Sequence, residues 1–166
     1  MSLILILLLM LAALLAPSSA AAVELNAKEQ TLLDLINTQR TAHGVPEVII
    51  RTVLYRSAKQ HSRSMIRHDY FSHLSWNGDS FAERLRAAGY TKAGYSTWRV
   101  GEVLAYGTGL PGTPRGVLDR WMSSKAHRKV ILKAGWRDCG IGRIYGTYDG
   151  QQGVAMYTVD FGRRID

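Results

Sequence analysis

The order of its apolar patterns constrains the fold of this chain more than any other feature. Helix-type patterns fill most of the chain between residues 26 and 127, and one strand-like run, VGEVLAYG at 100–107, interrupts them. Two further strand-like runs close the chain. Because helices and strands do not alternate regularly, the pattern argues against a doubly wound parallel sheet. The sequence therefore predicts an α+β sandwich.

Capping signals place two of the helices. Asn26 and Glu29 have the spacing of a capping box and predict a first helix, which Gly44 stops. Ser80 and Glu83 repeat that spacing and predict a short helix before Gly89.

Two more helices follow from amphipathic spacing and from proline. The segment 51–69 separates into two faces around a helical wheel, and His61 lies on the apolar side, where we expect a hydrogen-bonded core histidine. Thr113 caps a further helix that begins at Pro114 and is expected to run to residue 127. The apolar face of 51–69 is Leu54, Ala58, His61 and Met65, and its basic face is Arg56, Lys59, Arg63 and Arg67.

The C-terminal part of the chain predicts a β-hairpin. CGIGRIYG at 139–146 and GVAMYTVDFG at 153–162 are strand-like, and the Asp-Gly pair between them favours a tight turn. The glycines of the first run lack the spacing of a dinucleotide-binding loop, so we interpret them as strand glycines.

The N-terminal part of the chain is typical of an export signal. Residues 3–16 are all apolar and small residues follow them, so we predict a secretory signal at 1–22 and a single domain at 23–166. The segment lacks the usual Lys or Arg at its start, which leaves an uncleaved anchor as the alternative. After cleavage we expect no transmembrane span.

Cysteine content and charge restrict the class of protein further. Exported proteins commonly use disulfides, yet Cys139 is the only cysteine, so no intrachain disulfide can form and the core alone must hold the fold. We expect Cys139 to be a buried small residue. The formal net charge of +8 favours anionic surroundings.

Several segments, read in order, resemble one known family. They are LLDLINTQRTAHGVPEV, AKQHSRSMIRHDYFSH, FAERLRAAGY, GEVLAYG, VLDRWMSSKAHRKVIL, CGIGRIYG and YTVDFG. Together they resemble the bacterial SCP-like domains of the CAP superfamily, which also includes cysteine-rich secretory proteins, antigen 5 and plant pathogenesis-related proteins. The resemblance implies an α-β-α sandwich with a central antiparallel sheet.

The same resemblance implies a cleft where histidines and acidic residues can hold zinc or another divalent metal. By position, the cleft residues are His73, Glu102 and His127, and all three are candidate metal ligands. Glu83 is a fourth cleft candidate, although a capping box also accounts for it. The chain departs from the family pattern where Val103 and Val130 replace two asparagines, and valine offers no hydrogen-bonding group.

These observations lead to one functional hypothesis and two alternatives. The leading hypothesis is a secreted binding module, outside the cell or at the cell envelope, that takes an unidentified apolar ligand or an anionic envelope polymer. One alternative is a zinc-dependent, protease-like hydrolase that uses the same cleft. The other is an anionic-polymer binder that uses Arg56, Lys59, Arg63 and Arg67, a face that could equally be merely solvated. We do not expect nucleic acid as a partner, and whether the protein is an enzyme stays open.

Overall fold

The structure, a computed structural model, describes residues 23–166. The predicted secretory signal, residues 1–22, lies outside the described residues. None of the helices in 23–166 combines the length and the apolar character that a membrane crossing needs. In chain order the elements are α1 (Ala27–Ala42), β1 (Ile49–Ile50), α2 (Thr52–His68), α3 (Phe81–Ala87), β2 (Thr97–Gly107), a 3-10 turn η1 (Leu110–Gly112), α4 (Pro114–Ser123), α5 (Lys125–Ile131), β3 (Asp138–Tyr148) and β4 (Gln151–Ile165).

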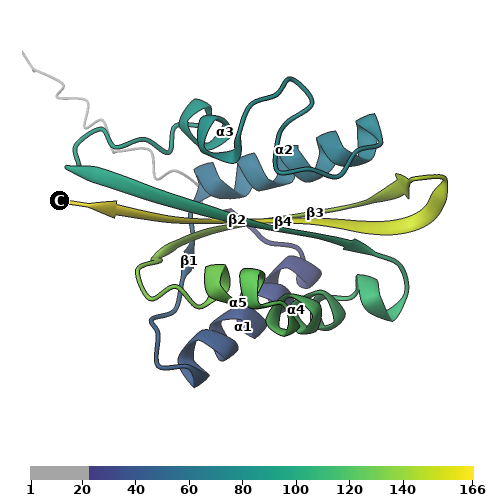
Figure 1. Ribbon diagram of the computed structural model, residues 1–166, viewed down its shortest axis with the longest axis horizontal. Helices are drawn as coiled ribbons and strands as arrows, with labels where there is room; N and C mark the ends of the chain where they lie inside the picture. The colour runs from purple at the N-terminus through teal and green to yellow at the C-terminus, as the bar shows by residue number, and fades with distance from the viewer. Residues whose placement is uncertain (1–22) are drawn as a thin grey trace, which may run out of the picture.

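The elements form three layers, which confirms the predicted α-β-α sandwich. In Figure 1, α2 and α3 lie above the sheet and α1, α4 and α5 lie below it. The strand order is β1-β3-β4-β2, and the pairs β3–β4 and β2–β4 are antiparallel. The order makes β2 an edge strand, although its residues 102–105 are buried by the helices of the two outer layers.

The predicted capping boxes and the hairpin are confirmed. Asn26 accepts hydrogen bonds from the first turn of α1, and Ser80 does the same for α3. Asp149 and Gly150 join β3 to β4, and their φ values of 50° and 70° are both positive, as a type I′ hairpin turn requires.

The fold differs from the prediction at two places. The two-residue strand β1 was not predicted, and it pairs with β3 in parallel, so the sheet is mixed rather than purely antiparallel. The predicted single helix at 114–127 is wrong, because Ser124 takes an extended conformation (φ −85°, ψ 119°) and divides it into α4 and α5. The Ser123 hydroxyl also donates to the Asp119 carbonyl, a local bond that competes with helix continuation.

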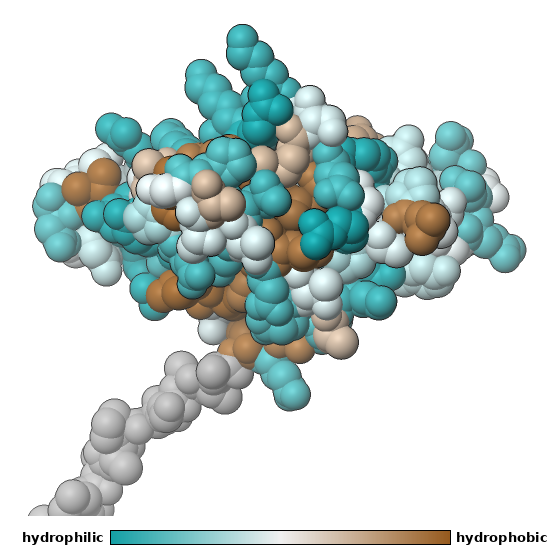
Figure 2. Space-filling model, turned by 90° about the horizontal axis from the view of Figure 1, so that it is seen from below, coloured by the Kyte–Doolittle hydropathy of each residue, from teal (hydrophilic) through white to brown (hydrophobic). Residues whose placement is uncertain are grey.

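The sheet has two different faces. The lower face packs a continuous apolar core against α1, α4 and α5. Cys139 belongs to this core with no exposed surface, as expected, and burial raises the pKa of its thiol, which makes it a poor nucleophile. Figure 2 looks onto the outside of this lower layer, where hydrophilic side chains predominate and apolar ones form separate patches.

The upper face of the sheet is approached very closely by α2. A Cβ added at Gly142 would lie 2.2 Å from the Ala58 carbonyl carbon, and one at Gly140 would lie 2.1 Å from that of Leu54. Both glycines therefore let the helix backbone rest directly on β3. Their role in packing confirms the interpretation of CGIGRIYG as a strand.

Candidate functional site

A strip of buried polar residues divides the apolar packing between the sheet and the upper helices. One apolar cluster is centred on Leu54 and Leu85, and a second on Met65 and Met156. Buried polar side chains occur on the same face of the sheet and on the inner face of α2. They are Ser57, His61, Ser62, Glu102, Thr158 and Asp160, each with at most 6% of its surface exposed.

His73 and Glu102, both predicted cleft residues, are joined by a hydrogen bond at this strip. His73 lies in the loop between α2 and α3, and its Nδ1 is 2.7 Å from Oε1 of Glu102 on β2. The imidazole is about half exposed, whereas the carboxylate is fully buried. Because a carboxylate oxygen only accepts, Nδ1 carries the proton, and a neutral ring then presents Nε2 as a free acceptor or metal ligand.

Arg84 on α3 contacts both members of this pair. It was not among the residues predicted from the sequence. Its Nη2 donates to Oε2 of Glu102, and its Nη1 donates to the carbonyl of His73 at 2.9 Å. Nη1 also lies 3.1 Å from the hydroxyl of Ser75. Arg84 thus neutralises the buried carboxylate and fixes the loop that carries His73.

Asp160 is a second buried carboxyl at the same place, and it was also missed. It is directly opposite Glu102 in the pairing of β2 with β4 and has no exposed surface. Neither of its oxygens has a hydrogen-bond partner among the described residues. Burial, and then the negative charge of Glu102, raise the pKa of Asp160 well above 3.8, while Arg84 opposes that rise.

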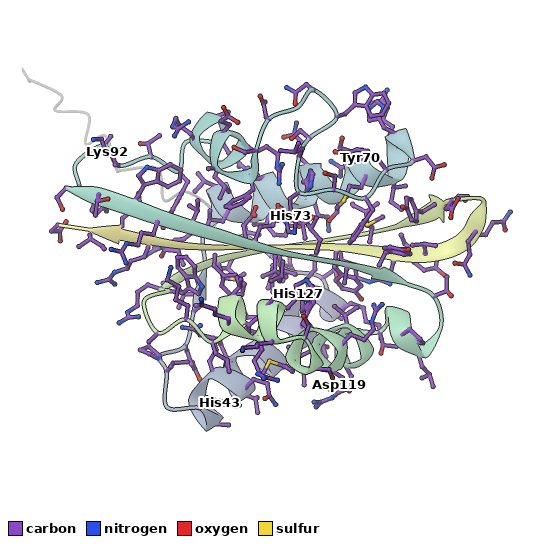
Figure 3. The ribbon with its side chains drawn as sticks, viewed as in Figure 1. His43, Tyr70, His73, Lys92, Asp119 and His127 are labelled. Atoms are coloured by element: carbon purple, nitrogen blue, oxygen red, sulfur yellow. The ribbon has the colours of Figure 1, made fainter. Side chains whose placement is uncertain are left out.

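His127 approaches the edge strand from the opposite layer. It lies on α5, and Figure 3 shows His73 above β2 and His127 below it. Partial burial lowers the pKa of His127, and the nearby His73 lowers it further, so this imidazole is neutral at neutral pH. The two predicted histidines therefore flank the same strand edge.

A cavity of about 290 Å³ opens beside His127, and we call it the histidine cleft. Two of its walls are the exposed rings of Phe71 and Tyr106, which meet edge to face with centroids 4.9 Å apart. The cleft is therefore mainly apolar, with one imidazole, one guanidinium and two hydroxyl side chains in its lining. Its lining is Phe71, Leu104, Ala105, Tyr106, Arg120, Trp121, Ser124 and His127.

The donor set near the cleft is smaller than a catalytic metal site needs. Within residues 23–166, no three His, Cys, Asp or Glu side chains lie close enough together to hold a metal ion. Both oxygens of Glu102 already have partners, His73 and Arg84. Catalytic zinc sites use three protein ligands, whereas here two imidazoles face the strand edge.

The two valines that depart from the family pattern take part in apolar packing. Val103 is fully buried in the lower core, and Val130 packs against that core. Their surroundings include Trp136, whose indole donates to the carbonyl of Val130 at 2.7 Å. Among residues 23–166, no side-chain amide donates or accepts a hydrogen bond at these two positions.

Glu83 and the basic face lie outside the histidine cleft. The carboxylate of Glu83 accepts hydrogen bonds from the backbone and hydroxyl of Ser80, and those bonds lower the pKa of Glu83. On α2, Lys59 forms an ion pair with buried Glu29. The remaining basic residues of that face, Arg56, Arg63 and Arg67, are exposed.

Two signals in the sequence could have revealed Arg84 and Asp160. Arg84 lies three residues after Phe81, so the arginine side chain starts beside an apolar residue of α3. Asp160 interrupts the apolar run of the last strand. A charged residue in a buried pattern is costly and so marks a polar site, and this one lies across from Glu102, a second buried carboxyl.

Comparison with known proteins gives consistent matches. The family model described as "Cysteine-rich secretory protein family", CAP, matches residues 33–161. The uncharacterized protein YkwD of Bacillus subtilis is 30% identical over 127 residues, which are 76% of this chain and 46% of YkwD. This chain spans less than half the length of the curated relatives it matches.

Two solved structures share the fold. An extracellular protein of Bacillus anthracis that contains an SCP domain has a TM-score of 0.66 and 28% identity, over 82% of this chain and 40% of that one. An outer surface protein of Borrelia burgdorferi has a TM-score of 0.69 and 19% identity, over 86% of this chain and 96% of that one.

Proposed function

Because this chain belongs to the CAP family of cysteine-rich secretory proteins, we propose that it is a binding module that works outside the cell or at the cell envelope. The location is supported by the N-terminal apolar segment and by the similar proteins described as extracellular and outer-surface. The observation that carries the proposal is the histidine cleft, an apolar cavity at an open strand edge with a neutral imidazole at its rim. Such a cavity suits an apolar ligand group that carries one hydrogen-bonding atom.

Filling the histidine cleft should abolish binding of a small apolar probe. We expect N-phenyl-1-naphthylamine, which is neutral, to fluoresce on binding the parent protein and not the Ser124→Phe variant. Ser124 lines the cavity, so a benzyl group there occupies the space of the probe. A fluorescence titration measures the effect.

Ser123→Phe is the matched control for this experiment. Ser123 is the preceding residue, is exposed, and does not line the cavity. The proposal requires that Ser123→Phe bind the probe as the parent does. Equal binding by both variants, with parental circular dichroism, would place the probe elsewhere and contradict a binding role for the cleft.

We further propose that a divalent ion such as zinc binds at the edge of β2, beside the histidine cleft, through His73 and His127. Glu102 would orient His73 rather than bind the ion, since both of its oxygens are engaged. The ion would supply a Lewis-acid contact to an oxygen of the ligand. Two protein ligands imply modest affinity.

Zinc titration by calorimetry at about pH 8, where histidine side chains are ordinarily neutral, tests this ion site. We expect heat of binding from the parent protein and none from the His73→Ala/His127→Ala double variant. His43→Ala is the control, because Figure 3 places His43 at the far end of α1, away from both cleft histidines. Binding that survives in the double variant, or that is lost in His43→Ala, would contradict the two-histidine site.

The zinc-dependent hydrolase suggested as an alternative has less support. It requires a catalytic ion with three protein ligands and an activated water. The described residues bring two imidazoles to the strand edge, and the nearest carboxylate is buried behind Arg84 and His73. We therefore propose a binding module rather than a hydrolase.

One observation favours a second binding function, for anionic polymers. A groove of about 520 Å³ runs along α2, and we call it the basic groove. Its lining includes Arg56, Lys59, Arg63 and Arg67 and contains no Asp or Glu. Within residues 23–166, no ion pair or hydrogen bond engages the side chains of Arg56, Arg63 or Arg67. Three unpaired guanidinium groups along one helix are suited to phosphates or carboxylates spaced along a chain. Binding should weaken steeply as salt is added.

A further inference from the structure

A second cavity, of about 380 Å³, lies between α2, α3 and the loop at 75–79, and we call it the α2–α3 cavity. It adjoins the basic groove, because Gln60 and Ser64 line both. Its volume is within the range of small-ligand pockets. Neither the family resemblance nor the histidine cleft assigns a role to it.

The floor of the α2–α3 cavity contains buried polar atoms that lack partners. His61 is 1% exposed and Ser57 is 4% exposed, and both line the cavity. Nδ1 of His61 and Nε of Arg84 have no hydrogen-bond partner among the described residues, whereas Oγ of Ser57 lies beside the buried carboxyl of Asp160. Buried groups of this kind are usually satisfied, so their shared cavity indicates a polar occupant.

The hydrogen-bonding character of these atoms can be assigned. Nε2 of His61 is 2.9 Å from the Ser72 carbonyl, which only accepts, so Nε2 carries the proton. Burial lowers the pKa of His61 to about 4, so the ring is neutral and Nδ1 is an acceptor. Ser57 can donate or accept, and Nε of Arg84 donates. The floor therefore offers a neutral acceptor at His61 and a charge-assisted donor at Arg84, and both kinds of partner suit the hydroxyl groups of a polyhydroxylated ligand.

An exposed indole stands at the same cavity. Trp76 is 64% exposed and lines the cavity. Its ring stacks on His68 with centroids 4.9 Å apart and planes 11° apart, which fixes its orientation. An aromatic ring held at the mouth of a polar cavity can pack against the C–H face of a pyranose ring.

We propose that the α2–α3 cavity binds one sugar ring of an anionic glycan whose charged groups lie along the basic groove. The proposal rests on the second binding function above and adds the sugar to it. A single-stranded nucleic acid fits less well, since such ligands stack on a series of aromatic side chains and the cavity lining includes one aromatic residue, Trp76.

Three probes separate sugar recognition from charge in calorimetric titrations. A galacturonate hexamer supplies rings with carboxylates, maltohexaose supplies rings without charge, and linear polyphosphate supplies charge without rings. We expect the galacturonate hexamer to bind most tightly. Arg63→Gln should weaken both anionic probes and flatten their salt dependence.

Trp76→Ala distinguishes the cavity from the groove. It should weaken the galacturonate hexamer about tenfold, the size expected for one lost stacking contact, and leave polyphosphate unchanged. Tyr145→Ala is the matched control, because Tyr145 is equally exposed at 64% but lies on β3 outside the cavity. The ¹⁵N resonance of His61 Nδ1 should also shift when the galacturonate hexamer binds and stay in place with polyphosphate.

Several results would overturn the proposal. One such result is a galacturonate hexamer that binds no more tightly than polyphosphate, with an affinity that Trp76→Ala does not change. That result would mean that the basic groove recognises charge alone and that the cavity binds no sugar. Tighter binding of an oligothymidylate than of the galacturonate hexamer would favour nucleic acid. If neither anionic probe binds, the basic groove itself has no such function, which is a separate failure of the second binding function.

Discussion

Gly142→Ala is expected to destabilise the protein by about 3 kcal/mol, the upper end of the usual cost of overpacking, because the added methyl group meets backbone atoms. The added methyl carbon would lie 2.2 Å from the carbonyl carbon of Ala58 and 2.3 Å from the amide nitrogen of Lys59. These are backbone atoms of α2, so no side chain can move aside. Urea unfolding followed by circular dichroism measures the loss, and the Gly140→Ala/Gly142→Ala double variant should fail to fold.

Gly135→Ala is the matched control for that substitution. A Cβ at Gly135 meets no atom within 4 Å, and its φ is not positive, so the free energy of unfolding should change by less than about 0.5 kcal/mol. If Gly142→Ala proves as stable as Gly135→Ala, α2 cannot rest on β3 as closely as described. The polar strip and the α2–α3 cavity depend on that same approach.

The parts of the fold that the sequence predicted are those with local causes. Asn26 with Glu29 and Ser80 with Glu83 mark helix starts by hydrogen bonds within four residues, and the structure has both. The Asp-Gly turn is equally local. In contrast, the strand order that makes β2 an edge strand depends on long-range packing, which no short pattern encodes.

The candidate site likewise contains residues that the sequence predicted and residues that only the tertiary structure reveals. The resemblance placed His73 and Glu102, and the structure joins them. It did not identify Arg84, because the role of Arg84 arises from an approach of α3 to β2 that only the tertiary structure creates. His127 reaches the same strand edge from the other layer, whereas Glu83 remains at a helix start. Charged residues in apolar patterns were the available signal, and Arg84 and Asp160 both had it.

Arg84→Met should cost about 3–5 kcal/mol at pH 7, as expected when one partner of a buried ion pair is removed. Glu102 would keep a fully buried carboxylate beside Asp160, with His73 as its remaining hydrogen-bond partner among the described residues. Arg86→Met on the same helix is the control, since Arg86 is exposed. The Glu102→Gln/Arg84→Met double variant should recover part of the loss, because it removes the orphaned charge.

The loss of stability caused by Arg84→Met should also depend on pH. The pKa of Asp160 determines whether that loss grows or shrinks as the pH rises. The folded-state pKa of Asp160 lies above its unfolded value near 3.8, so the carboxyl favours folding when protonated and that stability is lost as pH rises towards the folded pKa. Arg84 opposes the rise in the pKa of Asp160, so removing Arg84 raises that pKa further. The pH range over which stability is lost then extends to higher pH. The difference between Arg84→Met and the parent should therefore shrink at pH 4 and grow towards pH 7. A difference that is independent of pH, measured by urea unfolding at both values, would mean that Arg84 contributes packing rather than charge to the buried acidic pair.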